Sequence, residues 1–283
     1  MKILMTGATS FIGKHILPFL DISDHEVWHL VRSKKGLYRE LIWDFTGSLP
    51  SGLPQCDVLI HLAAKANFGQ ELEYIQYQVN TLSTIKLAAY AKENKIYFIF
   101  ASMASIHGSQ CELVDYNSPL NPDTNYSLSK YLAEEVIKTF TDCYSILRIS
   151  GVYGLDGPGH LGLNKAITDA LYMHKRPTLK GSGNVKRNYI CVQDVAKWII
   201  KLIDTYYYEN YRNITAKKKE ILYLSGNETM TILDYLQHIV DILLPGQFIE
   251  KIEGATSHDF IVQPSPAPFK LIKFKEYLKQ ILR

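Results

Sequence analysis

The sequence predicts an α/β protein with a doubly wound parallel sheet and a small mixed α/β lobe towards the carboxyl terminus. Strand-like and helix-like segments alternate over the first 150 residues, and the strand-like segments 57–64 and 96–102 are almost entirely apolar. Parallel strands covered by helices on both faces need such runs, because neither face of the sheet meets water. After residue 150 the alternation weakens and a glycine-rich stretch follows.

Apolar runs predict the strands, and helical periodicity predicts the helices between them. In chain order we expect strand 2–6, helix 11–20, strands 26–31, 40–45 and 57–64, helix 71–94, strand 96–102, helix 127–142 and strand 144–150. Beyond residue 150 we expect helix 163–174, a short strand running into a helix over 188–205, strand 220–225, helix 231–243 capped by Thr231, and a proline-containing tail that ends in a basic helix.

These elements predict two domains. A nucleotide-binding domain takes residues 1–160, with 188–205 and 220–225 returning to it. A smaller substrate-binding lobe takes residues 161–187 and 226–283.

The composition excludes several functional classes. A net charge of +3 is too small to favour nucleic acid or an anionic membrane. No apolar run reaches the roughly 18 residues of a transmembrane helix, and the start lacks the layout of a signal peptide. The 4 cysteines are scattered, so we expect neither disulfides nor a metal site. We therefore expect a cytoplasmic protein that acts on a small molecule.

The first motif is "TGATSFIG", where the first strand meets the first helix. Backbone N–H groups at a helix start bind anions, and the helix dipole adds positive potential. Gly7 allows a tight turn, Gly13 allows close helix–strand packing, and Ser10 stands between them at even spacing. The motif predicts a pyrophosphate site in which the Ser10 hydroxyl can donate to a phosphate oxygen. An ordinary strand-to-helix turn is the alternative.

The second motif is "VRSKK" at the end of the second strand. An NAD-specific site has an acidic residue here for the ribose 2′-OH, whereas a guanidinium and neighbouring donors suit a 2′-phosphate. Arg32 and Ser33 therefore favour NADP(H) over NAD(H). Solvated charge at a strand end is the alternative.

The third motif is "YSLSK", in which Tyr126 and Lys130 lie one helical turn apart on one face. A free tyrosine is a poor acid or base at neutral pH. A neighbouring ammonium favours the phenolate, so the pair predicts an acid/base unit.

Together with "DVLIHLAAKA", "QVNTLSTIKLAAYA", "FIFASMASIHG", "LRISGVYG", "GSGNVKRNYICVQDVA" and "LYLSGNETMTI", these motifs give a resemblance along most of the chain. The chain resembles an extended short-chain dehydrogenase/reductase of the NAD(P)-dependent sugar-nucleotide epimerase/dehydratase family. The resemblance implies a Rossmann-type fold, a nucleotide-sugar substrate and a homodimer formed through helices 71–94 and 127–142.

The resemblance also implies roles by position. Tyr126 would be the acid/base, and Lys130 would bond the nicotinamide ribose and hold the pKa of the tyrosine down. Arg187 matches an arginine that contacts a substrate diphosphate. The cofactor-binding residues that it implies are Gly7, Thr9, Ser10, Phe11, Ile12, Gly13, Arg32, Ser33, Asp44, Phe45, Leu62, Ala63, Ala64, Lys65, Asn80, Ala101, Tyr126, Lys130 and Ile149.

The chain departs from the family pattern beside the substrate. Met103 stands where the family has a catalytic Ser or Thr, and a thioether cannot donate a hydrogen bond. Ser102 and Ser105 are the candidate replacements, with Ser105 slightly favoured because an extended backbone would point it the same way. His107 replaces a tyrosine and could donate to substrate or pack in the loop. Gly151 replaces an asparagine that touches the substrate diphosphate.

Three functions remain open. The first is an NADP(H)-dependent reductase or an epimerase acting on a nucleotide-linked deoxy or keto sugar, with Met103, His107 and Arg187 beside the substrate. The second is a reductase of a non-nucleotide carbonyl compound, favoured by Gly151 and the short tail. The third is a non-catalytic NADP(H)-binding sensor, favoured by Met103.

Overall fold

The computed structural model describes residues 1–66, 74–211, 218–254 and 257–283. The chain forms two compact units. The first consists of Met1–Gly108, Leu120–Arg148 and Ala196–Leu222, and the second of Ser109–Pro119, Ile149–Val195 and Tyr223–Arg283. Among the described helices, none combines the length and the apolar character that crossing a bilayer requires.

A seven-stranded sheet forms the centre of the first unit. Its strands, in spatial order, are β12 (Lys219–Leu224), β7 (Tyr144–Ile149), β5 (Tyr97–Met103), β4 (Val58–His61), β1 (Lys2–Thr6), β2 (Glu26–Val31) and β3 (Glu40–Ile42). The pairs β1–β2, β1–β4, β2–β3 and β4–β5 are parallel. The chain proceeds from β1 to one side and then returns to the other, so the strand order reverses between β1 and β4. The predicted α/β fold with a doubly wound sheet is confirmed.

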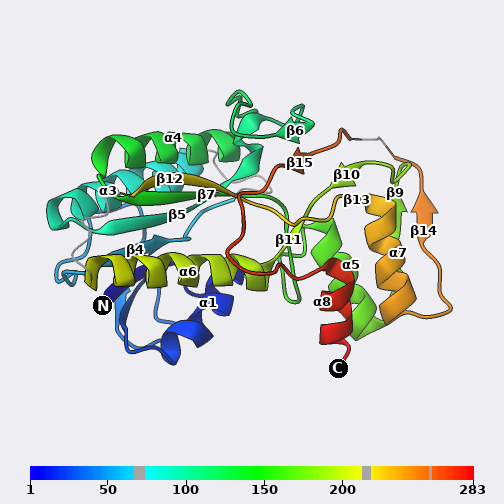
Figure 1. Ribbon diagram of the computed structural model, residues 1–283, viewed down its shortest axis with the longest axis horizontal. Helices are drawn as coiled ribbons and strands as arrows, with labels where there is room; N and C mark the ends of the chain where they lie inside the picture. The colour runs from blue at the N-terminus through cyan, green and yellow to red at the C-terminus, as the bar shows by residue number, and fades with distance from the viewer. Residues whose placement is uncertain (67–73, 212–217, 255–256) are drawn as a thin grey trace. The chain divides into compact units, whose positions relative to one another are not determined.

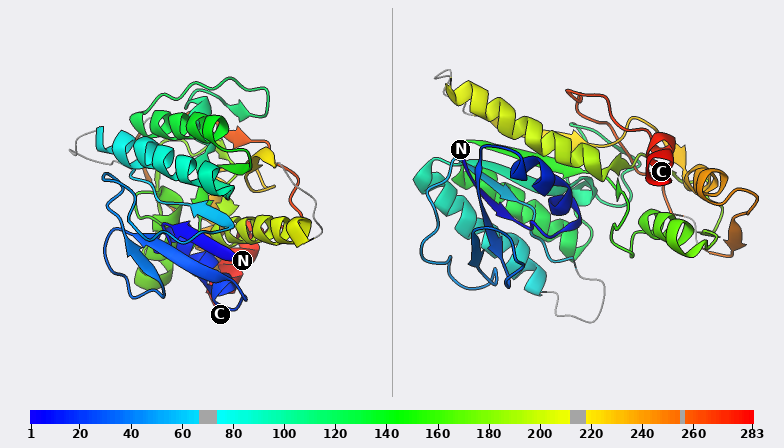
Figure 2. Two further views of the ribbon diagram at one scale, coloured as in Figure 1. Left: turned by 90° about the vertical axis from the view of Figure 1, so that its left-hand side faces the viewer. Right: turned by 90° about the horizontal axis from the view of Figure 1, so that it is seen from below.

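Helices cover both faces of this sheet. Helices α3 (Ser83–Asn94) and α4 (Asn125–Phe140) lie on one face, whereas α1 (Phe11–Asp21) and α6 (Val192–Tyr211) lie on the other (Figure 1 and Figure 2). The strand side chains between the two layers are apolar because both of their surroundings are protein. Leu4, Leu59 and Phe98, for example, are fully buried.

Two predicted strands are shorter in the structure. Strand β3 ends at Ile42, because Asp44 accepts hydrogen bonds from the N–H groups of Thr46 and Gly47 and closes a turn. Phe45 has a positive φ of 68° in this turn, which no strand accommodates. Strand β4 covers Val58–His61, where 57–64 was predicted.

The predicted helix 71–94 is not one regular helix. Its first three residues lie outside the described residues, and helix α2 (Tyr74–Tyr77) is followed by a π-helical turn, Gln78–Leu82, before α3 begins. Helix α4 begins at Asn125, two residues earlier than predicted, because Thr124 and Ser127 form a capping box.

The second unit is built on helices α5 (Gly162–Met173), α7 (Ile232–Leu243) and α8 (Phe274–Ile281). Their apolar faces meet in one core that includes Ile167, Ile239 and Leu278. Thr231 caps α7 as predicted. Four short strand pairs complete the mixed α/β lobe: β10 (Lys186–Arg187) with β13 (Met230–Thr231), β11 (Ile190–Cys191) with β8 (Val152–Tyr153), β14 (Glu250–Ile252) with β9 (Thr178–Lys180), and β15 (Ile261–Val262) with β6 (Leu113–Val114).

Candidate active site

A cavity of about 520 Å³ lies in the first unit at the carboxyl ends of β1, β2 and β4. This is the edge where open α/β sheets bind ligands, beside the point where the strand order reverses. It collects many of the cofactor-binding residues that the sequence predicts: Gly7, Thr9, Ser10, Arg32, Asp44, Phe45, Leu62, Ala63, Ala64 and Lys65. The wall also contains Lys35, a further donor of the motif VRSKK, and residues to which the sequence analysis gave no role: Ala8, Leu30, Val31, Thr46, Ala66, Ile75 and Val79.

Different steric contacts require glycine at the two glycine positions of the first turn. Gly7 has a positive φ of 72°, and a side-chain Cβ there would lie 2.7 Å from the backbone nitrogen of Ala63. A Cβ on Gly13 would overlap the carbonyl oxygen of Gly7. Both positions therefore exclude side chains, and the backbone stays open at the mouth of the cavity.

Ser10 is the N-cap of α1. Its Oγ accepts a hydrogen bond from the Gly13 N–H at 3.1 Å, and its backbone N–H donates to Gly7 O at 2.9 Å. Among the described residues, the N–H groups of Phe11 and Ile12 have no acceptor, as is usual for the first turn of a helix. These two N–H groups remain available for an anion, whereas Gly13 contributes through packing.

The cavity is positively charged at the end of β2. Arg32 and Lys35 line it, and among the described residues neither side chain has an ion pair or hydrogen bond. Ser33, which the sequence also predicts, is exposed and does not line the cavity. Asp44 lines the cavity with its carboxylate engaged: hydrogen bonds, first from the Gly47 N–H and then from Thr46, lower the pKa of this group.

A buried hydrogen-bond chain fixes the backbone after β4. Thr84 Oγ1 donates to Asn80 O, so His61 Nε2 must donate to Thr84 at 3.0 Å. His61 Nδ1 then accepts from Thr6 Oγ1 at 2.7 Å, and Thr6 accepts from the Ala63 N–H. Burial, followed by the charge of Lys130, lowers the pKa of His61 well below its usual range, which keeps the imidazole neutral in this chain.

Asn80 lies inside the protein, with 1% of its surface exposed. Its Oδ1 accepts from the Lys65 N–H at 2.7 Å, and its Nδ2 donates to Lys65 O and to Ser129 Oγ. The residue is absent from the cavity wall. Asn80 therefore holds the loop that presents Lys65, and its role toward a cofactor stays a prediction.

Tyr126 and Lys130 occupy the first turns of α4 as predicted. Lys130 is 2% exposed, and its Nζ lies 3.9 Å from the ring centroid of Phe100. Burial lowers the pKa of Lys130 to about 7, and Glu134 raises it in part. Desolvation raises the pKa of Tyr126. Burial is thus the cause of the shift at Tyr126, and the expectation that Lys130 holds the pKa of Tyr126 down stays a prediction.

Hydrogen bonding around the turn after β5 distinguishes the two serine candidates. Ser102 is buried and donates to Glu134 Oε1 at 2.5 Å. Ser105 lies in the 3-10 turn Ala104–His107, half-buried, and its hydroxyl has no partner among the described residues. His107 is 3% exposed, with Nε2 3.4 Å from Nη1 of Arg148. Ser105 is the hydroxyl of this turn that remains free, and Met103 is half-buried beside it.

Seven further predicted cofactor residues are absent from the cavity wall: Phe11, Ile12, Gly13, Ala101, Tyr126, Lys130 and Ile149. Ala101 is a half-buried residue of β5, and Ile149 is the buried last residue of β7.

In the second unit, Arg187 binds backbone. Its Nη1 donates to Lys186 O at 2.8 Å and to His258 O at 2.6 Å. The space that a side chain at Gly151 would need is filled by the ring of Tyr189. This packing is a physical reason why no asparagine stands at position 151.

A cavity of about 350 Å³ lies between α5, β9 and α7 of the second unit. Its wall is basic, since Lys165, Lys175, Arg176 and Lys180 all contribute to it. Lys165 pairs with Asp169 at 2.6 Å. The sequence analysis named none of these residues, because they are spread over a helix, a loop and a strand.

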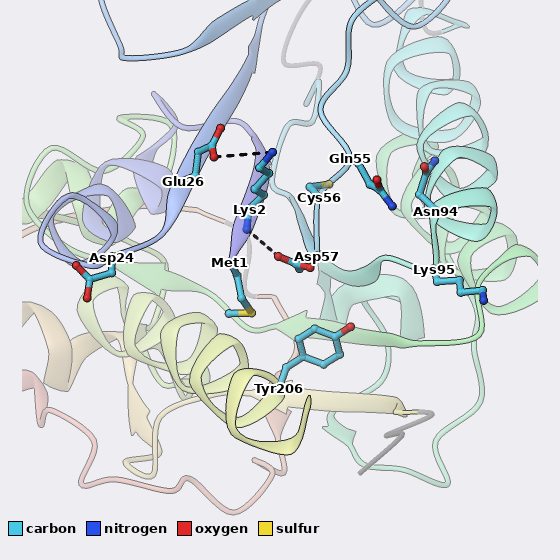
Figure 3. Close-up of a pocket in the computed structure, with 10 residues that line it drawn as sticks. All are labelled: Met1, Lys2, Asp24, Glu26, Gln55, Cys56, Asp57, Asn94, Lys95 and Tyr206. Carbon is cyan, nitrogen blue, oxygen red and sulfur yellow. Dashed lines mark hydrogen bonds and ion pairs between the residues drawn. The ribbon is translucent and has the colours of Figure 1, made fainter. Parts of the chain in front are cut away.

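A further cavity, of about 500 Å³, lies at the opposite, amino edge of the large sheet (Figure 3). There the Lys2 N–H donates to Asp57 Oδ2 at 2.8 Å, and Lys2 Nζ lies 4.0 Å from Glu26 Oε2. None of the predicted site residues lines this cavity. Among the described residues, no cluster of His, Cys, Asp and Glu could hold a metal ion.

Comparison with known proteins gives consistent matches. Residues 3–214 match the model of the "NAD dependent epimerase/dehydratase family". The chain is 32% identical to a putative UDP-glucose 4-epimerase of Methanocaldococcus jannaschii, over 69% of this chain and 71% of the relative. It is 25% identical to a GDP-6-deoxy-D-talose 4-dehydrogenase of Aggregatibacter actinomycetemcomitans, over 96% of this chain and 90% of the relative. UDP-glucuronic acid 4-epimerase from Bacillus cereus, solved with NAD, shares the fold with a TM-score of 0.79 at 20% identity, over 99% and 94% of the two chains.

Proposed function

Because the chain belongs to the NAD dependent epimerase/dehydratase family of extended short-chain dehydrogenases/reductases, we propose that it is an NADP(H)-dependent oxidoreductase acting on a nucleotide-linked sugar. The observation that carries the NADP(H) preference is the pair of uncompensated cations at the end of β2. Arg32 and Lys35 line the cavity there, and no carboxylate follows β2 directly. A guanidinium and an ammonium suit a 2′-phosphate, whereas a ribose 2′-OH is best met by a carboxylate.

The rest of the cavity supports a dinucleotide. The glycine turn leaves backbone open where side chains would block a pyrophosphate, and the Phe11 and Ile12 N–H groups are free to bind its oxygens. A bound nicotinamide supplies or accepts hydride at its C4 atom. Lys130 has ammonium donors with no hydrogen-bond acceptor among the described residues, so it can hold the nicotinamide ribose.

Tyr126 moves the proton in this proposal. Its phenol gives a proton to the sugar oxygen during reduction and takes one back during oxidation. The raised pKa of Tyr126 keeps the phenol protonated at neutral pH, which suits the reductive direction. Ser105 replaces the hydroxyl that is missing at Met103, because Ser102 is held by Glu134.

We assign the nucleotide of the substrate to a cavity that lies wholly within the second unit. The basic cavity lined by Lys165, Lys175, Arg176 and Lys180 suits a diphosphate or a nucleotide edge. Arg187 has its Nη1 hydrogen-bonded to two backbone carbonyls, so its main role is to hold β10 to the segment near His258.

The experiment measures cofactor and substrate separately. Fluorescence titration compares NADPH with NADH, and absorbance at 340 nm follows NADPH with a panel of nucleotide-linked 4-keto-6-deoxy sugars. We expect tighter binding of NADPH and its oxidation by at least one sugar. The variant Tyr126→Phe should bind NADPH normally and lose turnover. Failure of the whole panel to oxidise NADPH would sink the reductase assignment.

A second candidate is 4-epimerisation of a UDP-hexose. It is favoured by the 32% identity to a putative UDP-glucose 4-epimerase. Incubation with UDP-glucose and catalytic NAD or NADP, followed by NMR of the sugar H1 signals, distinguishes the two functions. Appearance of the 4-epimer without net oxidation of cofactor would support the epimerase and displace the reductase.

We also propose a homodimer formed through α3 and α4. Leu132 of α4 is 37% exposed and Leu82, just before α3, is 48% exposed, so this layer offers apolar surface. Light scattering of the purified protein decides between monomer and dimer.

A further inference from the structure

Helix α4 carries a third ionisable residue on the face of Tyr126 and Lys130. Glu134 follows Lys130 by one turn, and it is fully buried. Burying a carboxylate costs several kcal/mol unless it is paired and hydrogen-bonded. The proposed reaction uses the first two residues of this row and leaves Glu134 without a role.

The carboxylate of Glu134 is held from two strands. Arg148 of β7 donates through Nη2 to Oε2 at 2.8 Å, and through Nε to both oxygens at 3.2 and 3.3 Å. Ser102 of β5 donates its hydroxyl to Oε1 at 2.5 Å. Lys138, the next residue of the row, lies 3.9 Å from Oε2. Glu134 thus has a fixed position between α4 and the sheet.

The same contacts tie down the turn that carries Ser105. Ser102 lies just before this 3-10 turn, and His107 ends it. Ser102 bonds Glu134 directly, whereas His107 lies 3.4 Å from Arg148, which pairs with Glu134. Both sides of the turn are therefore linked to one carboxylate, Ser102 directly and His107 through Arg148, and Ser105 lies between them with its hydroxyl free.

The charge of Glu134 also reaches Lys130 through the protein interior, where screening by salt is weak. The groups that interact with the Lys130 ammonium are Phe100 of β5, His61 of β4 and Glu134 of α4, and Tyr126 lies one turn before Lys130 on the same helix. His61 is neutral, and Tyr126 is protonated at neutral pH. Among these groups Glu134 supplies the negative charge that favours a protonated Lys130.

We propose that Glu134 is a positioning residue for the reaction, which keeps Lys130 charged and fixes the turn that carries Ser105 without touching substrate or cofactor. The proposal rests on the function proposed above for Tyr126 and Lys130. It extends that function from the reacting groups to the buried network behind them.

The first experiment measures the charge without any turnover. Protein labelled with ¹³Cε-lysine is titrated by NMR, and Lys130→Met identifies the Lys130 signal. In Glu134→Gln, which keeps the shape but removes the charge, the Lys130 midpoint should fall by about one pH unit or more. Glu134→Asp keeps the charge and should restore most of the midpoint. Equal midpoints in wild type and Glu134→Gln would overturn the proposal.

The second experiment measures the reaction. The alkaline limb of the kcat–pH profile should move to lower pH in Glu134→Gln, whereas Ser102→Ala should lower kcat with the limb unmoved. Profiles of Glu134→Gln and wild type that superimpose, after normalisation to the folded fraction, would leave Glu134 a merely structural residue and overturn the proposal. If none of the sugars in the panel supports oxidation of NADPH by the wild type, the proposed function fails while the proposal for Glu134 is still testable. The pH dependence of NADPH affinity in the same variants then tests Glu134.

Discussion

The two edges of the large sheet carry cavities of similar volume, about 520 Å³ at the carboxyl edge and about 500 Å³ at the amino edge. Their charges differ in kind. At the amino edge Glu26 and Asp57 already accept hydrogen bonds from Trp28 and Lys2, whereas the side chains of Arg32 and Lys35 at the carboxyl edge have no hydrogen bond or ion pair among the described residues. Volume alone therefore does not distinguish a binding site from a hollow in the surface.

The backbone differs between the edges as well. The carboxyl edge has a glycine turn and the start of α1, where N–H groups point outward. At the amino edge α3 ends, with Lys95 in the left-handed conformation and its N–H donating to Ala91 and Lys92 carbonyls. A helix start attracts anions and a helix end does not. The comparison predicts that changes at the carboxyl edge alter cofactor binding and matched changes at the amino edge do not.

The largest effect should come from Gly13→Ala. The added methyl overlaps the carbonyl oxygen of Gly7, so α1 or the turn must move. We expect NADPH affinity to fall by about 100-fold or more, equal to about 2.7 kcal/mol. Gly162→Ala is the matched control, because a Cβ there meets no atom within 4 Å. Titration calorimetry of both variants checks this; normal affinity in Gly13→Ala would place the cofactor elsewhere.

Next in size is the effect of removing the two cations. Arg32→Ala with Lys35→Ala should weaken NADPH binding by about tenfold or more and change NADH binding by less than about threefold. Lys2→Ala with Lys95→Ala removes the same charge from the amino edge and should change neither. An equal loss of affinity for NADPH and NADH would mean that the cations act on the pyrophosphate, and it would contradict the proposed preference for NADP(H).

Lys130 gives a pH-dependent prediction. Its pKa falls from the ordinary lysine value of 10.5 to about 7, so between these pH values the unfolded chain binds a proton that the folded chain does not. Stability conferred at this position therefore rises with pH across that window. Lys130→Met removes the effect, and the free energy of unfolding that it gains over wild type should be about 2.7 kcal/mol larger at pH 6 than at pH 9. Urea unfolding at both pH values measures it; parallel curves would show an ordinary lysine.

The sequence predicted the fold and the residues at the carboxyl edge only in part. Periodicity and apolar runs predicted the sheet and the covering helices, and local spacing predicted the glycine turn and the Tyr126–Lys130 pair, since both depend on neighbours in the chain. It did not predict that Ser102 is held by Glu134, or that the Lys130 ammonium faces Phe100. Those facts depend on side chains brought together from different strands and helices, whose directions no linear pattern specifies.

The smallest expected effect concerns Ser10, which stands where a third glycine of the turn would leave the backbone bare. Its hydroxyl accepts from the Gly13 N–H, so it caps α1 and can still donate its own proton to a phosphate. Ser10→Ala removes the cap and should lower the free energy of unfolding by about 1 kcal/mol, whereas Ser10→Gly should lower it by a few tenths. Both variants should retain NADPH affinity within about threefold, because the Phe11 and Ile12 N–H groups remain. Denaturant unfolding and NADPH titration separate the two roles: a loss of about tenfold in affinity without a matching loss of stability would make the hydroxyl itself a phosphate ligand.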